Sequence, residues 1–198
     1  MLLKSIDDKS KRLRLLEELQ SSDRLDARQR EWLKGELKRF QSGMSGERDA
    51  AHYIDMYLAD GKNHVILHDL RLEADGQTAQ IDHLIIGRAF VVYLLETKTF
   101  GGSLHINEHG EFHVEYPNER SYGIESPLEQ SRRHETVVRK VFDRLGIVGR
   151  AGTAPWFEHV VLVHPKAIIH RPPKGTFDNS RVIKADQFGS WHTQGQRI

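Results

Sequence analysis

The sequence contains no cysteine, and this absence excludes disulfide-bonded scaffolds, zinc ribbons and cysteine nucleophiles. It also lacks a hydrophobic run long enough to cross a bilayer. The short apolar start, Met1-Leu-Leu3, is followed by Lys4 and then by acids, which is not the pattern of a signal peptide. We therefore expect a cytoplasmic protein that does not associate with a membrane.

An excess of either charge is absent as well. There are 29 lysines and arginines against 28 aspartates and glutamates, which gives a net charge of +1. No uniform basic field is therefore available to attract nucleic acid, and any such contact must come from a local patch. The length of 198 residues and the hydrophobic share of 38% fit one ordinary globular domain with an extension.

Residues 1–42 differ from the rest because charged residues and leucines dominate them. Apolar residues recur at helical spacing on either side of a break at Ser21–Asp23, namely Leu13, Leu16 and Leu19, then Trp32, Leu33, Leu37 and Phe40. We expect an N-terminal helical extension that packs on the main domain or on a second copy of the chain as a homodimer. Most charged helices of this kind are solvated and have no catalytic role.

The main domain is expected over residues 43–190. One helix is predicted from an N-cap at Ser45, and a second from Ser126-Pro127 to the stop at Gly146. Runs of β-branched and apolar residues predict strands at about 64–72, 78–86, 90–98, 104–106, 112–116, 160–163 and 181–184, and Asp75-Gly76 predicts the turn between the first two. These elements indicate an α/β (α+β) domain, followed by a C-terminal tail over 191–198 with no clear organisation.

Two of the predicted strands carry charges that a buried strand should not carry. The first contains Asp82, and the second ends in Glu96-Thr-Lys98. An ionised carboxylate in a buried strand costs several kcal/mol unless a cation or hydrogen bonds compensate. Two acids and a lysine placed in this way suggest a cation site with a basic group beside it. This combination is suited to the hydrolysis of phosphodiester bonds.

The turn between these strands decides whether the acids meet. A two-residue loop at Gly87-Arg88 would pair Asp82 with Tyr93, on the wrong face. A three-residue loop, Gly87–Ala89, would pair Asp82 with Leu94 and leave Glu96 diagonal to it, with Cβ atoms about 7–8 Å apart. We therefore predict an odd-length loop or a β-bulge, because carboxylates on opposite faces could not share a metal.

The two predicted helices add further candidates. Glu47 lies at the end of an apolar stripe, although an acid in the first helical turn is the simpler explanation. Gln130 projects inward with Val137 and Val141, where a buried amide needs polar partners. Arg133, Lys140 and Arg144 form a neighbouring stripe that could hold phosphates or be an ordinary solvated face.

Four patterns, in order, carry a family resemblance: Gly46-Glu-Arg-Asp49, Gln80-Ile-Asp-His83, Glu96-Thr-Lys98 followed by Phe100-Gly-Gly102, and Pro127-Leu-Glu-Gln130. Over about residues 43–165 the chain resembles the nuclease-related domain (NERD) family of the PD-(D/E)xK superfamily. That resemblance implies a restriction-endonuclease-like core, with a mixed central sheet flanked by helices. The chain departs from the pattern at Ile81, where the superfamily has proline, and at His134, where related exonucleases often have tyrosine.

The resemblance also implies a mechanism. Mg²⁺ or Mn²⁺, which prefer oxygen ligands, would be held by Asp82, Glu96 and the backbone carbonyl of Thr97. Glu47 would be an outer or second-metal ligand. Lys98 would orient or deprotonate the attacking water, and Gln130 would position water or the substrate backbone. The expected activity is metal-dependent phosphodiester hydrolysis in DNA processing.

Other readings compete with this one. His105, His109 and His113 recur every four residues, but they fall in a predicted hairpin and no H-E-x-x-H motif is present, which disfavours a zinc enzyme. His83 should point to the opposite face from Asp82 as a structural histidine. A catalytically inactive nuclease-like module that binds nucleic acid or a protein remains the main alternative, since a fold alone does not establish activity.

Overall fold

The computed structural model describes residues 1–117 and 120–195. Its centre is a six-stranded mixed sheet in the order β1-β2-β3-β4-β8-β10. The three strands β2, β3 and β4 form an antiparallel meander, and the other three run parallel to their neighbours. Their bounds are Leu2–Lys4 (β1), His64–Ala74 (β2), Gln77–Gly87 (β3), Val91–Lys98 (β4), Trp156–Val163 (β8) and Val182–Lys184 (β10).

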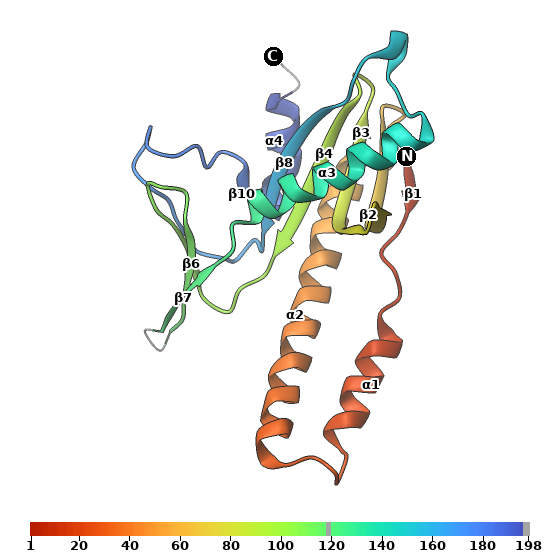
Figure 1. Cartoon of the computed structure of the whole chain (residues 1–198). Coiled ribbons are helices and arrows are strands. Elements are labelled where there is room, and N and C mark those ends of the chain that lie inside the picture. The colour runs from red at the N-terminus through yellow and green to blue at the C-terminus, as the bar shows by residue number, and fades with distance from the viewer. Residues whose placement is uncertain (118–119, 196–198) are drawn as a thin grey trace.

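Helices cover both faces of this sheet (Figure 1). On one face, helix α2 (Ala27–Leu58) packs Ile54 against Ile85 and Leu95. On the other face, helix α3 (Pro127–Leu145) packs Val137 and other apolar residues against Leu84 and Leu94. The alternation of side chains along β3 and β4 therefore feeds two separate cores, and the predicted mixed sheet flanked by helices is confirmed.

A second, four-stranded sheet in the order β7-β6-β5-β9 stands beside the first (Figure 1). Its bounds are Ser103–Ile106 (β5), Phe112–Glu115 (β6), Ser121–Ile124 (β7) and Ile169–His170 (β9). Its apolar face packs on Leu128 of α3 and on Val161 and Val163 of β8. Strands β4 and β8, which are parallel neighbours, continue into β5 and β9, which are parallel neighbours in turn. Both connections thus leave the central sheet at the same end of its strands, the C-terminal end of β4 and β8.

Helix α2 is one continuous element and corrects the prediction of a helix starting at Ser45. Its N-cap is Asp26, which forms a reciprocal capping box with Gln29. Ser45 lies in its interior, and the expected boundary at residues 42 and 43 falls inside the helix. Three glycines between residues 35 and 46 weaken the local helix signal by about 1 kcal/mol each, but tertiary packing and the absence of proline keep the helix intact.

The N-terminal region is tied into the domain by a strand that the sequence did not reveal. Leu2 of β1 pairs with Ile66 of β2. The amino group of Met1 donates hydrogen bonds to the carbonyl oxygens of Gly61 and His64, at 2.7 and 2.6 Å. Helix α1 (Ser10–Gln20) then packs on α2 as a hairpin (Figure 1). The expected extension is therefore helical only in part, and its first residues belong to the central sheet.

The expected C-terminal tail is also structured up to residue 195. Helix α4 (Phe188–Gly195) follows two short 3-10 turns, η1 (Arg150–Gly152) and η2 (Ala185–Gln187), in chain order. Phe188 is fully buried in the core beneath α2. The helix was missed because it is short, while burial of its aromatic residues supplies the stabilisation. The last three residues of the expected tail lie outside the described residues.

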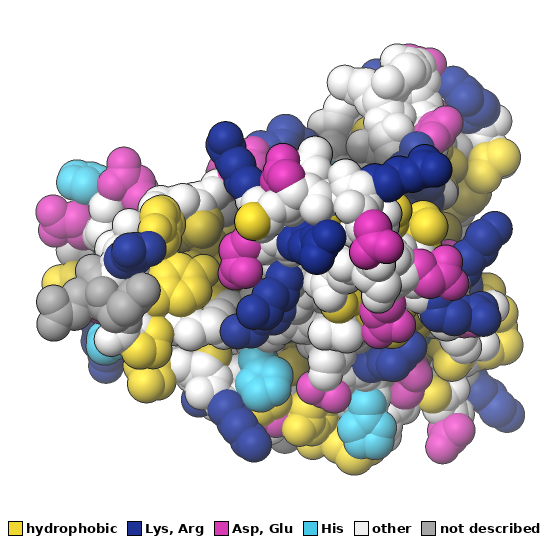
Figure 2. Space-filling model, turned by 90° about the horizontal axis from the view of Figure 1, so that it is seen from below, with side chains coloured by type: hydrophobic (Ala, Val, Ile, Leu, Met, Phe, Trp, Pro, Cys, Tyr) yellow, Lys and Arg dark blue, Asp and Glu magenta, His cyan; other side chains and the backbone are white. Residues whose placement is uncertain are grey.

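The predicted caps of α3 and the predicted turn between β2 and β3 are confirmed. Ser126 caps α3, with its hydroxyl accepting from the Glu129 N–H, and Gly146 ends the helix in the left-handed conformation. Asp75 and Gly76 both have positive φ, as a two-residue hairpin turn between β2 and β3 requires. Within the described residues, no helix is long and apolar enough to cross a membrane. On the face seen from below, basic and acidic side chains alternate (Figure 2).

Gly46 is required where α2 crosses the end of β4. A Cβ there would lie 2.0 Å from Thr99 Oγ1, whereas a Cβ at Gly43 would meet nothing within 4 Å. We expect Gly46→Ala to lower the free energy of unfolding by about 1–3 kcal/mol through overpacking, and Gly43→Ala to raise it by about 0.5–1 kcal/mol through helix propensity. Urea denaturation measures both.

The control is the double variant Gly46→Ala/Thr99→Ala, which removes the colliding oxygen. Because Thr99 Oγ1 has no hydrogen-bond partner, its loss should cost little and should restore most of the stability. Equal effects of alanine at both glycines would contradict the proposed close contact.

Candidate active site

The register of β3 and β4 brings the two predicted carboxylates together. Ile86 pairs with Val92, Leu84 with Leu94, and His83 with Leu95. The connecting loop is Arg88-Ala89-Phe90, with Phe90 at φ 57° and its N–H bonded to the Gly87 carbonyl at 3.0 Å. The prediction of an odd-length loop is confirmed, but the loop starts one residue later than expected. The ladder ends at His83–Leu95, and its next step would set Asp82 level with Glu96 instead of diagonal to it.

Asp82 lies where the ladder between the two strands ends. Its Oδ2 accepts a hydrogen bond from the Thr97 backbone N–H at 2.7 Å, in place of a main-chain bond. On the other side, the pairing of β2 with β3 skips from His68–His83 to Leu70–Ile81, and Asp69 between them has φ 50°. One residue is skipped on each strand and the register is unchanged, so this is a local distortion without an inserted residue, and it lets Asp82 leave the regular ladder.

Glu96 and Lys98 contact each other and Gln130. The Lys98 Nζ donates to Glu96 Oε1 at 2.7 Å and to Gln130 Oε1 at 3.0 Å. Glu96 is only 4% exposed, so this charge-assisted bond is strong for its kind. His134, one turn beyond Gln130, has its Nδ1 3.9 Å from Glu96 Oε2. The structure therefore joins three of the predicted residues directly.

Burial dominates the electrostatics of the two acids. It raises the pKa of Asp82 well above its ordinary value, and the charge of Glu96 raises it further against the opposing Thr97 N–H. Burial likewise raises the pKa of Glu96, although Lys98 and a hydrogen bond from Gln130 oppose the rise. Two acids held this way are short of positive charge, and a divalent cation between them would supply it.

The donor set fits an oxygen-loving cation, with limits. Thr97 engages only Oδ2 of Asp82, which leaves Oδ1 of that carboxylate for a metal. Glu96 is contacted by Lys98 and Gln130, so a metal would share this carboxylate with them. Within residues 1–117 and 120–195, no three His, Asp or Glu side chains converge as a ready metal site. A metal here would therefore rely on the two carboxylates, a backbone carbonyl and water, as Mg²⁺ commonly does.

Glu47 lies beside this pair but contacts a residue that sequence reasoning missed. Its charge contributes to the raised pKa values of Asp82 and Glu96. Its Oε2 lies 2.6 Å from the Nζ of Lys9, which also lies 3.2 Å from Asp69 Oδ2. Asp69 could have been suspected, because it too is an acid in an apolar strand. Lys9 gave no signal, since it stands in a segment where charges are ordinary.

The three predicted phosphate-binding residues do not all share one acidic partner, and they lie at different distances from the carboxylates. Arg133 is one turn from Gln130 and pairs with Glu125. Lys140 and Arg144 both pair with Asp75 in the β2–β3 turn. They lie about 15 and 21 Å beyond Gln130 along the helix axis, so only Arg133 is near the carboxylates.

Behind the site, a buried chain of hydrogen bonds joins α2 to β4. His68 Nε2 lies 3.1 Å from Asp55 Oδ1, the two Nδ1 atoms of His68 and His83 are 2.8 Å apart, and His83 Nε2 is 3.0 Å from Thr97 Oγ1. The Asp55 carboxylate only accepts, and a neutral imidazole donates from one nitrogen and accepts at the other. The direction of each bond is therefore set: His68 donates to Asp55, His83 donates to His68, and Thr97 donates to His83. The predicted structural role of His83 is confirmed. These hydrogen bonds fix the side chain of Thr97, which stands between Glu96 and Lys98 in β4.

Two clefts flank the carboxylates. One, of about 740 Å³, is lined by Asp82 and Asp69 of the sheet, by Glu47 of α2, and by Lys9 and Arg12 on the α1 side. The other, of about 590 Å³, opens where β4 and β8 leave the central sheet.

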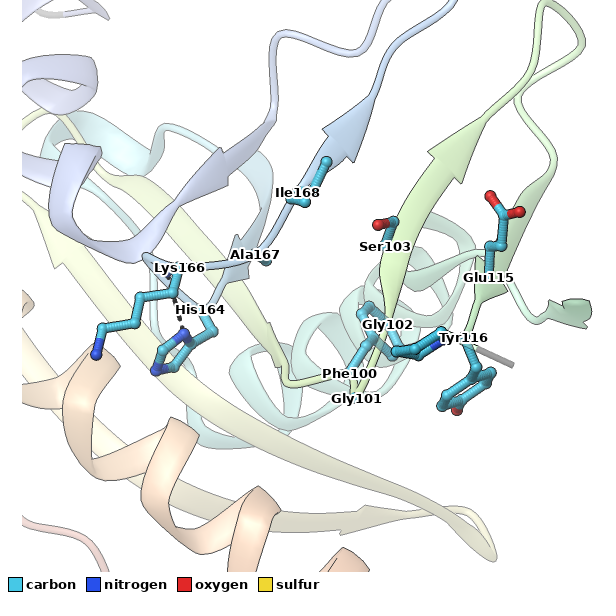
Figure 3. Close-up of a pocket in the computed structure, with 11 residues that line it drawn as sticks. Phe100, Gly101, Gly102, Ser103, Glu115, Tyr116, His164, Lys166, Ala167 and Ile168 are labelled. Carbon is cyan, nitrogen blue, oxygen red and sulfur yellow. Dashed lines mark hydrogen bonds between the residues drawn. The ribbon is translucent and has the colours of Figure 1, made fainter. Parts of the chain in front are cut away.

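The second cleft begins within two residues of Lys98, at Phe100. Figure 3 shows His164 and Lys166 on one side of it and Glu115 and Tyr116 on the other. Sequence reasoning gave no hint of this cleft, because it is formed by the chain crossing between two sheets.

Burial lowers the pKa of His83 well below 6.5 and lowers that of His68 as well. The unfolded chain therefore takes up more protons than the folded one below about pH 6.5. The contribution of these two histidines to the free energy of unfolding is complete above that pH and is lost as pH falls. We expect the urea midpoint to drop between pH 7 and 5, with a shallower drop for His83→Gln. His109, whose side chain is 74% exposed, supplies the control His109→Gln, which should keep the full slope; equal slopes in all three proteins would contradict this account.

Comparison with known proteins places this site in a family. The search of curated proteins gave no match, and neither did the search of solved structures. The family model described as nuclease-related domain matches residues 42–164, more than half of the chain. That range holds the candidate residues Glu47, Asp82, Glu96, Lys98 and Gln130, and the mixed α/β core agrees with the restriction-endonuclease-like fold of the PD-(D/E)xK superfamily. The chain therefore belongs to the nuclease-related domain (NERD) family.

Proposed function

We propose that this protein is a metal-dependent nuclease that hydrolyses phosphodiester bonds in DNA. The observation that carries the proposal is the contact cluster at the end of β4. There the Lys98 ammonium is held by Glu96 and Gln130, at 2.7 and 3.0 Å, and Asp82 accepts a hydrogen bond at 2.7 Å from the N–H of Thr97, the residue between Glu96 and Lys98. An acid pair with a fixed ammonium is what phosphodiester hydrolysis needs, because charge must be neutralised on a phosphate while water attacks it.

Asp82, Glu96 and the Thr97 carbonyl would hold Mg²⁺ or Mn²⁺. When bound, the ion would lower the pKa of a coordinated water and neutralise charge on the phosphate. The buried position of Glu96 strengthens every such interaction, since the surrounding sheet excludes water. The Thr97 N–H fixes Asp82 in place, so that its orientation does not depend on the ion.

Lys98 supplies the basic group. Its three N–H bonds cannot all be used by Glu96 and Gln130, so at least one can be directed at a water or a phosphate oxygen. In that position it would orient the attacking water and stabilise the extra negative charge of the pentacovalent transition state. Gln130 restrains Lys98 from α3, so the helix and the sheet together set where the ammonium points.

The cleft beside Lys98 provides a path for the substrate strand. Lys98 pairs with Val163 of β8, and the cleft lining begins at Phe100 and His164, roughly 7 Å of chain further on. Tyr116 offers a ring on which a base can stack, and Lys166 offers a charge for a phosphate. We infer that nucleotides flanking the scissile phosphate lie in this cleft.

The alternative function is a nuclease-like module that binds nucleic acid or a protein without turnover. The contact of Lys9 with Glu47 favours it, because it occupies a carboxylate that metal-dependent turnover could otherwise use. The homodimer expected through the N-terminal helices would suit such a module. It stays a prediction, for which Trp32, 63% exposed, is an available apolar contact.

Cleavage assays separate these functions. In Mg²⁺ or Mn²⁺, the protein should cut at least one of linear, circular and single-stranded DNA. We expect Asp82→Ala and Lys98→Ala to reduce the rate at least about 100-fold, as loss of an acid–base or charge-stabilising group does. Lys34→Ala, at an exposed position of α2, is the matched control. Metal binding without cleavage of any DNA or RNA would favour the binding module, and activity surviving both site variants would rule out this site.

Substrate binding tests the cleft separately from the chemistry. In a Lys98→Ala background, Tyr116→Ala should weaken single-stranded DNA binding, by about 1–3 kcal/mol if a base stacks there. Lys166→Ala should lower the salt dependence of binding by about one phosphate contact. Fluorescence anisotropy at several salt concentrations measures both, with exposed Lys174→Ala as the control. Unchanged affinity and salt slope in both cleft variants would place the substrate elsewhere.

A further inference from the structure

Lys9 brings a positive charge from the N-terminal segment into the acidic site. It stands immediately before α1, and its Nζ lies 2.6 Å from Glu47 Oε2 and 3.2 Å from Asp69 Oδ2. The side chains of these acids are 21% and 7% exposed, and that of Lys9 is 24% exposed. This is a partly buried contact of one ammonium with two carboxylates, which is worth more than an ordinary surface ion pair.

The segment that carries Lys9 is fastened at several points. The Lys4 Nζ donates to the carbonyl oxygens of His68 and Asp69, at 3.0 and 2.9 Å. The Asp7 N–H donates to Asp69 Oδ2 at 3.3 Å. Strand β1 is also part of the central sheet. The position of Lys9 is therefore fixed by β1 on its N-terminal side and by α1 on its C-terminal side. Its position is part of the fold and not a chance surface contact.

The acids of this site form two groups, each with its own lysine. Lys98 contacts Glu96 on the α3 side, and Lys9 contacts Glu47 and Asp69 on the α1 side. Asp82 adjoins both groups, since it lines the same cleft as Glu47 and Asp69 and accepts a hydrogen bond from the Thr97 N–H next to Glu96. Sites that cut phosphodiesters with two metal ions use carboxylates on both sides in this way.

We infer that Lys9 is a resident cation in place of a second metal ion, and that the site accepts one divalent ion, at Asp82 and Glu96. Lys9 is thus a positioning residue that neutralises Glu47 and Asp69 and keeps them from binding metal. This inference rests on the proposed function for its purpose, but its test does not need catalysis. It also makes the N-terminal segment a part of the site.

The test counts bound Mn²⁺ on the full chain, by isothermal titration and by the electron paramagnetic resonance signal of the free ion. We expect one ion for the wild type, two for Lys9→Gln and one for Lys11→Gln. Lys11 is the matched control because it lines the same cleft from an exposed position. Two ions on the wild type, or one on Lys9→Gln, would overturn the inference.

Two further variants guard against misfolding of Lys9→Gln. Lys9→Arg keeps the charge and should still bind one ion. Glu47→Gln should also bind one ion with affinity within about threefold of wild type, because Glu47 is not a ligand of that ion; loss of binding would overturn the inference. If the wild type binds no Mn²⁺, the proposed metal-dependent function fails. Lys9→Gln would then have to gain one ion for the role of Lys9 to stand.

Discussion

A buried carboxylate, Glu96, and a half-buried one, Asp82, at the end of a β-hairpin are the constraint on which this structure depends. Glu96 is almost fully covered, and burial raises the pKa of both Asp82 and Glu96. Unpaired charges in such a place would cost several kcal/mol each. Three groups stabilise these carboxylates. The Thr97 N–H bonds to Asp82, the Lys98 ammonium bonds to Glu96 from two residues along β4, and Gln130 contacts Glu96 and Lys98 from α3. A hydrophobic pair would be easier to bury here, which is why the arrangement points to chemistry.

Much of this could be predicted because the signals are local. The turn at Asp75-Gly76, the cap at Ser126 and the stop at Gly146 each depend on the conformational preferences of one or two residues. Parity predicts a common face for Asp82 and Glu96 with any odd loop. In the structure the strands distort at Asp82, which lines the cleft on the α1 side, while Glu96 contacts Lys98 and Gln130 on the α3 side. The loop boundary was off by one residue because Phe90, and not a glycine, adopts the positive φ, which a bulky residue rarely does.

The rest depends on contacts between distant segments. A three-residue strand such as β1 has no periodicity of its own and exists because β2 offers it an edge. Helical periodicity gave the face on which Lys140 and Arg144 lie but not their partner Asp75, 69 residues from Arg144. Packing keeps α2 continuous although its glycines locally disfavour a helix. Nothing in the sequence around Lys9 distinguishes it from its exposed neighbours.

The same contacts bear on where the functional unit begins. The family match starts at residue 42, inside α2 and five residues before Glu47. It therefore contains Glu47 but omits Lys9, the residue that Glu47 contacts. Without residues 1–41, Glu47 and Asp69 would keep their charges and lose their counterion, and like charges so close repel by several kcal/mol at an effective dielectric of about 20. The acidic half of the site is electrostatically complete only with the segment that precedes the matched domain.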